Sequence, residues 1–108
     1  LPLIEEFKDR IFHVHAKDAA VDEDKFKYYG VYNRVFPDPD AQRFEEGYWR
    51  FNMPGLGQVD WQGFFDALEA IGYDGVVSIE HEDADYEGSD EKIYEGLAKG
   101  YEFLKDFI

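Results

Sequence analysis

Two short apolar runs, each carrying side chains that can bind a metal, constrain this chain more than any other feature. The first spans about residues 10–17 and contains His13 and His15, and the second spans 75–80 and ends at Glu80. Apolar residues alternate in both runs, which is the pattern of a β-strand. An amphipathic helix follows each run, so the sequence predicts two βα units. Consecutive units of this kind place parallel strands side by side, with helices packed outside them.

Capping residues mark the start of both helices. Asp60 precedes an apolar stripe at helical spacing, formed by Trp61, Phe64, Phe65, Leu68 and Ile71. Gly72 follows, where a left-handed residue is expected to end the helix. Ser89 precedes the second helix, whose buried stripe is predicted at Ile93, Leu97, Tyr101, Leu104 and Ile108. Residues 1–9 have the pattern of the last turns of an earlier helix.

Two βα units cannot cover both faces of a parallel sheet or close a barrel. A complete (β/α)8 TIM barrel needs about 250 residues, and this chain has 108. We therefore expect an α/β fold made of the C-terminal βα units, about strands 7 and 8, of a TIM barrel that is incomplete in this chain. Residues 1–108 would be the C-terminal fragment of a single barrel domain, and the first residue, Leu1, indicates that the polypeptide begins earlier.

The connection between the first strand and the helix at Asp60 is long. It covers about residues 19–58, is rich in aromatic residues and proline, and is predicted to be irregular. Long connections in compact domains are commonly lids or binding loops. An inserted subdomain or an oligomer contact explains the composition equally well.

Composition limits the classes of partner. The formal net charge is −14 and the basic residues are scattered, which disfavours nucleic acid and anionic membranes. The chain has no cysteine, so disulfides and thiolate metal sites are excluded. No apolar run is long enough to cross a membrane. We expect a cytoplasmic protein that acts on a small molecule and could form a homo-oligomer.

Alternation along the two strands directs polar side chains to one face. His13 and His15 share a face of the first strand, and Glu80 shares a face of the second with Ser78. The opposite faces, which would meet the helices, carry Phe12, Val14, Val77 and Ile79. An imidazole and a carboxylate that converge suit a divalent metal with nitrogen and oxygen ligands. A hydrogen-bonded histidine and a salt-bridged glutamate explain the same pattern without a metal.

Three segments resemble the xylose-isomerase-like TIM barrels. They are FHVHAKD at 12–18, MPGLGQVDW at 53–61 and IGYDGVVSIEHED at 71–83. Within these barrels, they are most similar to the sugar phosphate isomerase/epimerase group, which includes ketose 3-epimerases and inosose dehydratases. The resemblance covers almost the whole chain and is weakest between Ala20 and Gly47.

The resemblance implies a divalent-metal-dependent sugar or sugar-phosphate isomerase or epimerase. In that family a His-x-His pattern ends the seventh strand, and its second histidine, here His15, binds the metal. A glutamate that ends the eighth strand, here Glu80, binds the metal and exchanges a proton with the substrate. The other two ligands come from earlier strands, and the metal would be Mn, Mg, Co or Zn. An arginine after the seventh strand holds substrate hydroxyls or phosphate, and Arg50 is its candidate.

Three further residues lie close to this predicted site. Lys17 and Asp18 come just past the first strand, where they could contact the substrate or pair with each other. His13 lies two residues deeper and would pack there, contact the substrate, or support a metal ligand through a hydrogen bond.

The chemistry explains why these residue types are needed. Moving a carbonyl, or inverting the carbon beside it, requires removal of a proton alpha to that carbonyl. A carboxylate can remove and return this proton, while a divalent ion stabilises the ene-diolate. Glu80 is therefore predicted to be the catalytic base as well as a metal ligand.

Other functions fit parts of the sequence. Residues 83–88 have the acid spacing of a calcium loop, but Tyr94 stands where a bidentate glutamate is needed. The same barrel type includes abasic-site endonuclease-like hydrolases and inosose dehydratase-like lyases. An endonuclease needs more histidine ligands and a basic groove. A non-catalytic barrel with a decayed metal site is the remaining alternative.

Overall fold

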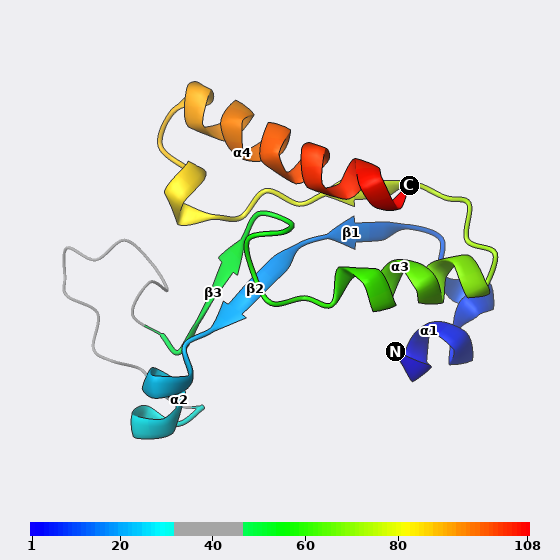
Figure 1. Ribbon diagram of the computed structural model, residues 1–108, viewed down its shortest axis with the longest axis horizontal. Helices are drawn as coiled ribbons and strands as arrows, with labels where there is room; N and C mark the ends of the chain where they lie inside the picture. The colour runs from blue at the N-terminus through cyan, green and yellow to red at the C-terminus, as the bar shows by residue number, and fades with distance from the viewer. Residues whose placement is uncertain (32–46) are drawn as a thin grey trace.

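The computed structural model describes residues 1–31 and 47–108 and has a mixed α/β fold (Figure 1). Its central feature is a pair of parallel strands, β1 (Val14–Ala16) and β4 (Val77–Ile79). The paired residues are Val14 with Val77, His15 with Ser78, and Ala16 with Ile79. The predicted parallel pairing of the two apolar runs is thus present.

Both strands are shorter than the predicted ranges of 10–17 and 75–80. In the described part of the chain each strand has one partner, so the ladder forms only where the two overlap. His15 consequently lies in the middle of β1 instead of at its end, and Glu80 is the first residue after β4. The Glu80 N–H donates to the Ala16 carbonyl at 3.0 Å, which continues the pairing by one residue.

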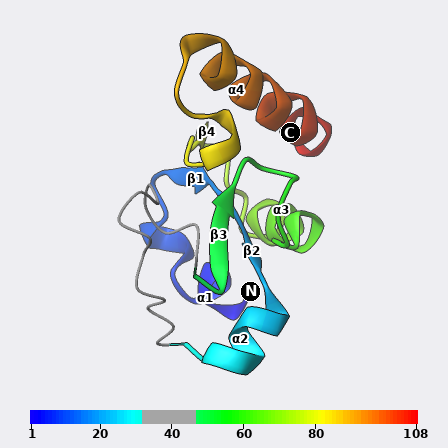
Figure 2. The same ribbon diagram turned by 90° about the vertical axis from the view of Figure 1, so that its left-hand side faces the viewer.

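The long connection after β1 contains regular structure, so the predicted irregular loop over 19–58 is wrong in its described parts. β2 (Asp18–Val21) pairs antiparallel with β3 (Trp49–Asn52), and α2 (Glu23–Tyr29) follows β2. The part of the loop at 32–46 lies outside the described residues. Figure 2 shows α2 and α4 at opposite ends of the molecule, with β2 and β3 between them.

The first predicted helix is confirmed as α3 (Trp61–Ala70). The Asp60 carboxylate accepts a hydrogen bond from a first-turn N–H at 3.0 Å, as a capping residue does. Gly72 has a φ of +70°, the left-handed conformation that commonly ends a helix. The predicted apolar stripe lies on the core side, where Trp61 and Leu68 are buried.

The second predicted helix, α4 (Asp90–Leu104), begins at the predicted cap, Ser89, but its buried face matches the prediction only in part. Of the predicted stripe, Leu104 is 2% exposed, but Tyr101 is 60% and Ile108 83% exposed, so the stripe is confirmed only in part. The buried residues of α4 are Gly96, Gly100 and Leu104.

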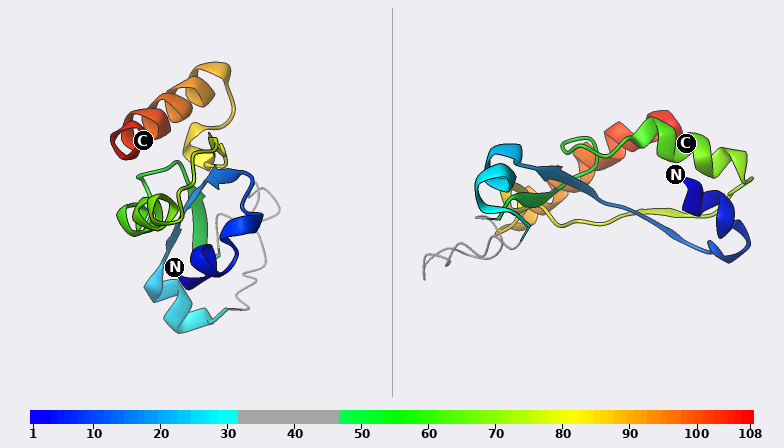
Figure 3. Two further views of the ribbon diagram at one scale, coloured as in Figure 1. Left: turned by 90° about the vertical axis from the view of Figure 1, so that its right-hand side faces the viewer. Right: turned by 90° about the horizontal axis from the view of Figure 1, so that it is seen from below.

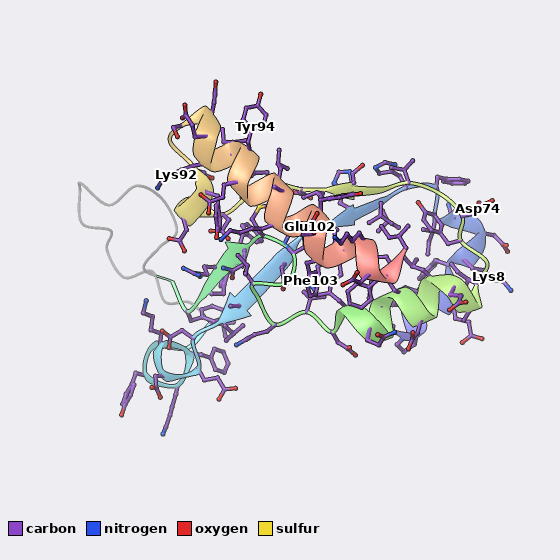
Figure 4. All side chains as sticks on the ribbon, turned by 45° about the horizontal axis from the view of Figure 1, so that its top comes forward. Lys8, Asp74, Lys92, Tyr94, Glu102 and Phe103 are labelled. Atoms are coloured by element: carbon purple, nitrogen blue, oxygen red, sulfur yellow. The ribbon has the colours of Figure 1, made fainter. Side chains whose placement is uncertain are left out.

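Glycine explains which face of α4 packs inward. A Cβ atom on Gly100 would lie 3.3 Å from Met53 and 3.3 Å from Pro54, so the helix backbone sits close to the segment after β3. Figure 4 shows Phe103 on the side of α4 that faces α3, whereas Tyr94 points away from the molecule. Close backbone approach thus turns larger side chains, such as Tyr94, outward.

The core lies between α3, α4 and the strand pair. The Trp61 and Phe103 rings join the two helices, with centroids 6.3 Å apart. The right-hand view of Figure 3 shows both helices on the same side of β1 and β4. Val77 and Ile79 pack against this core as predicted. Phe12 was expected to do so as well, but it precedes β1 and is 85% exposed.

Short helical segments complete the described fold. α1 (Pro2–Glu6) and a 3-10 turn (Lys8–Arg10) confirm that the first residues are helical. Two further 3-10 turns, η2 (Ala84–Tyr86) and η3 (Lys105–Phe107), flank α4 in the sequence. Among the described residues, no helix combines the length and apolar character that a membrane span requires.

Candidate functional site

Polar side chains in and next to β1 and β4 meet on the face of the strand pair that lies away from the core. His13 Nε2 lies 2.9 Å from Ser78 Oγ, and His15 Nδ1 lies 3.1 Å from Glu80 Oε2. The two imidazole rings meet edge to face, with centroids 5.1 Å apart. Ala16 is in the core, so the alternation of side chains along β1 accounts for this arrangement. His15 and Glu80 are therefore in direct contact.

Lys17 is the second partner of Glu80. Its Nζ lies 2.6 Å from Glu80 Oε1 and also forms an ion pair with Glu82. The same ammonium lies 3.9 Å from the centroid of the Phe51 ring on β3. The predicted pairing of Lys17 with Asp18 is wrong, because consecutive residues of an extended chain point to opposite faces.

These contacts fix the charges of the cluster. The hydrogen bond from Lys17, and then that from His15, hold the pKa of Glu80 below its ordinary value. Partial burial lowers the pKa of Lys17, but its hydrogen bonds with Glu80 and Glu82 outweigh that effect and raise it. At neutral pH the cluster therefore contains a carboxylate at Glu80 and an ammonium at Lys17.

The His15–Glu80 pair is open to solvent and chemically suited to a metal ion. The two side chains are 58% and 37% exposed. An imidazole nitrogen and a carboxylate oxygen are ordinary ligands of divalent cations, and their 3.1 Å separation lets both reach one ion. Within 1–31 and 47–108, no group of three or more histidine, cysteine, aspartate or glutamate side chains could hold a metal. The described residues thus fit part of a metal site.

Arg50 lies elsewhere. It is on β3, and its Nη1 lies 3.3 Å from a carboxylate oxygen of Asp85 in η2. With the Asn52 amide oxygen turned toward it, the guanidinium also donates from Nε and Nη2 at 3.1 and 3.0 Å. The contacts described for Arg50 thus tie β3 to η2 and do not include His15 or Glu80.

Asp18 is a buried structural centre that the sequence pattern did not reveal. Its side chain is fully buried. It accepts hydrogen bonds at 2.8–3.1 Å from the Trp61 indole and from the backbone N–H groups of Ala19, Gly55, Gly57 and Val59. Burial by itself would raise the pKa of Asp18, but these hydrogen bonds outweigh it and lower the pKa.

The turn at 54–57 has the backbone shape that its glycines predict. Gly55 has a φ of +87°, which disfavours residues with a side chain. A Cβ atom on Gly57 would collide with the Asp18 carboxylate. The turn therefore wraps around Asp18 and leads directly to the cap of α3.

Asp83 fixes the backbone after β4 in a similar way. It is 2% exposed and accepts hydrogen bonds from the Met53 N–H at 2.8 Å and the Asp85 N–H at 3.1 Å. Its carboxylate is thus the cap of η2 and a tie to the end of β3. In a calcium loop at 83–88, Asp83 would be the first ligand, but its carboxylate already accepts hydrogen bonds from two backbone N–H groups. These contacts argue against the calcium-loop interpretation.

Two residues next to the site were not among the predicted site residues. Phe51 lies on β3, a strand that was not predicted, so no pattern placed its ring beside Lys17. Glu82 lies two residues after Glu80, and alternation along an extended segment could have placed both on one side.

Comparison with known proteins decides the family. The family described as "Xylose isomerase-like TIM barrel" matches residues 2–107. This chain belongs to that family. The family includes isomerases, epimerases and endonucleases, and the parallel β1–β4 pair with α3 and α4 packed on one side is consistent with such a barrel.

This chain is also similar to part of a longer bacterial protein. The uncharacterized protein YfiH of Bacillus subtilis (strain 168) is 30% identical over 80 residues, which is 72% of this chain and 24% of that protein. The chain thus spans about a quarter of the length of this relative. The relative's name assigns no activity.

Proposed function

We propose that this chain supplies the last two βα units of a TIM barrel that acts as a divalent-metal-dependent sugar or sugar-phosphate isomerase or epimerase. The observation that carries the proposal is the contact between His15 and Glu80 at 3.1 Å, from neighbouring parallel strands. Membership in a family that includes isomerases and epimerases supports it.

His15 and Glu80 are the residues of this chain that would hold the metal. Their nitrogen and oxygen donors suit Mn, Mg, Co or Zn. The remaining ligands would come from earlier strands of the barrel. When bound, the ion would polarise the substrate carbonyl and a neighbouring hydroxyl.

Glu80 is the proposed base. Its lowered pKa keeps it ionised at neutral pH, which is the form that accepts a proton. Its side chain is 37% exposed, so a small substrate can reach it. Glu80 would take the proton alpha to the carbonyl, giving an ene-diolate, and return it to form the product.

The test is Glu80→Gln in the complete protein. Ketoses and ketose phosphates, with Mn²⁺ present, are incubated in D₂O, and proton NMR follows exchange of the hydrogen alpha to the carbonyl. In the wild type, this hydrogen should be exchanged for deuterium in at least one of the sugars. Glu80→Gln should abolish exchange while binding of that sugar stays measurable, because the amide keeps the shape of the side chain but is not a base.

Glu87→Gln is the matched control, since it makes the same charge change at an exposed residue on the same connection. It should exchange as fast as the wild type. Exchange that persists in Glu80→Gln at the wild-type rate would remove Glu80 from the mechanism. Loss of Mn²⁺ binding in His15→Gln, measured by calorimetry, tests the metal assignment separately.

A further inference from the structure

The two carboxylate oxygens of Glu80 have different partners. Oε2 contacts His15 Nδ1 at 3.1 Å, and Oε1 contacts Lys17 Nζ at 2.6 Å. The plane of the carboxylate is therefore set from both ends. One end faces the imidazole of a proposed metal ligand, and the other faces an ammonium.

Lys17 is itself held from several directions. Besides Glu80 it pairs with Glu82, and its ammonium lies over the Phe51 ring at 3.9 Å from the centroid. Contacts of this kind between an ammonium and an aromatic face are attractive. Its side chain is 24% exposed, compared with 58% for His15. With these contacts, Lys17 is poorly placed to move toward a substrate but well placed to fix the position of Glu80.

We propose that Lys17 is a positioning residue for Glu80. It holds Oε1 so that Oε2 is the oxygen presented to the His15 side of the site. This inference rests on the proposed function and gives Lys17 a role other than the substrate binding expected from the sequence. A cation shared with His15 would meet one oxygen of Glu80 while the other stays on Lys17.

Lys17→Met separates this role from the alternatives. Methionine keeps an unbranched side chain over Phe51 but removes the ammonium. Both Glu80 oxygens then become free to approach a cation, and a nearby positive charge is lost, so Mn²⁺ should bind about threefold more tightly. Proton transfer depends on the orientation of Glu80, so kcat should fall about tenfold with little change in KM.

The experiment uses the complete protein and three measurements. Crystal structures of the metal-free wild type and Lys17→Met compare the orientation of the Glu80 carboxylate, which should change in the variant. Calorimetry with Mn²⁺ alone measures affinity, and steady-state kinetics separates kcat from KM. Lys99→Met is the control, because it removes one positive charge from a lysine on α4 that pairs with Glu95. It should leave all three measurements unchanged.

Lys17→Arg provides a rescue. A guanidinium can donate to Oε1 and stack on Phe51, so it should restore the wild-type orientation of Glu80. An unchanged Glu80 orientation in Lys17→Met, or weaker Mn²⁺ binding in it, would overturn the proposal. A raised KM at constant kcat would instead make Lys17 a substrate ligand. If the wild type neither binds Mn²⁺ nor turns over a sugar, the proposed function fails, while the metal-free crystal structures still decide the role of Lys17.

Discussion

At the residue scale, buried carboxylates shape the backbone around the site. Asp18 is the larger centre, because one carboxylate satisfies the N–H groups of a whole turn and the indole of Trp61. Asp83 repeats this role on a smaller scale after β4. Their neighbours in sequence, Lys17 and Glu82, point to the polar cluster instead. Each buried carboxylate therefore anchors the stretch of backbone that carries a residue of the site.

Acid should weaken the fold through Asp18. The pKa of this group is lower in the folded protein than its ordinary value of 3.8. Its contribution to stability is therefore complete above about pH 5, begins to fall near pH 4, and is lost as the pH drops through the folded pKa. Urea unfolding at pH 7, 5, 4 and 3 measures this dependence.

Asp18→Asn is the comparison variant in that experiment. It should lower the free energy of unfolding at pH 7 by about 3 kcal/mol, because one amide NH₂ now faces N–H donors. Its loss of stability between pH 5 and pH 3 should be smaller than that of the wild type. Asp66→Asn, at an exposed position on α3, should change stability by less than about 0.5 kcal/mol. Equal effects of the two variants would contradict the role of Asp18.

At the element scale, α4 shows what a helical pattern alone cannot predict. Its start at Ser89 was predictable, because capping depends on local hydrogen bonds. Its buried face was predictable only in part, because the helix packs through Gly96 and Gly100 as well as through Phe103 and Leu104. Apolar periodicity identifies an amphipathic helix only where bulky residues make the contact, as they do on α3.

Gly96→Val tests this close packing. A Cβ atom on Gly96 would lie 2.9 Å from the Cβ of Tyr86, which is tighter than normal contact. The variant should lower the free energy of unfolding by about 2 kcal/mol through overpacking, despite replacing a helical glycine. Ala98→Val, at an exposed position of the same helix, should cost only about 0.6 kcal/mol. If Gly96→Val were as stable as Ala98→Val, α4 and η2 would be able to move apart at little cost.

Strands were less predictable than helices for a related reason. The two parallel strands and the face that each presents followed from alternation, and so did the meeting of His15 and Glu80. Their ends depend on pairing partners, which a single sequence does not show, so β1 and β4 are shorter than expected. β2 and β3 were missed altogether, because their pairing joins segments separated by many residues. The position of Phe51 beside Lys17 could not be predicted without them.

At the scale of the whole chain, the net charge favours the proposed sugar isomerase over the endonucleases that this family includes. The chain carries a formal net charge of −14, from 25 acidic and 11 basic residues. A surface of this sign repels the phosphate backbone of nucleic acids. A sugar isomerase has no such conflict, since its substrate is held by a few local groups.

If the proposed function is right, the complete protein should not cleave DNA at abasic sites. A duplex with one abasic site, incubated with Mn²⁺ or Mg²⁺ at low salt, should remain intact on a denaturing gel. Electrostatic binding of DNA is strongest at low salt, so a duplex that stays intact under this condition argues against endonuclease activity. Cleavage that depends on Glu80 would contradict the proposed sugar isomerase function and favour a hydrolase.

Side chains alternate between two sides of the chain from His15 to Asp18, so the number of residues in this stretch is constrained. The side chains of His15 and Lys17 lie in the polar cluster, while those of Ala16 and Asp18 are buried in the interior. Inserting or deleting a single residue here would exchange the two sets, sending an ammonium inward and a carboxylate outward. A change in the length of this stretch would therefore disturb the core and the polar cluster at the same time.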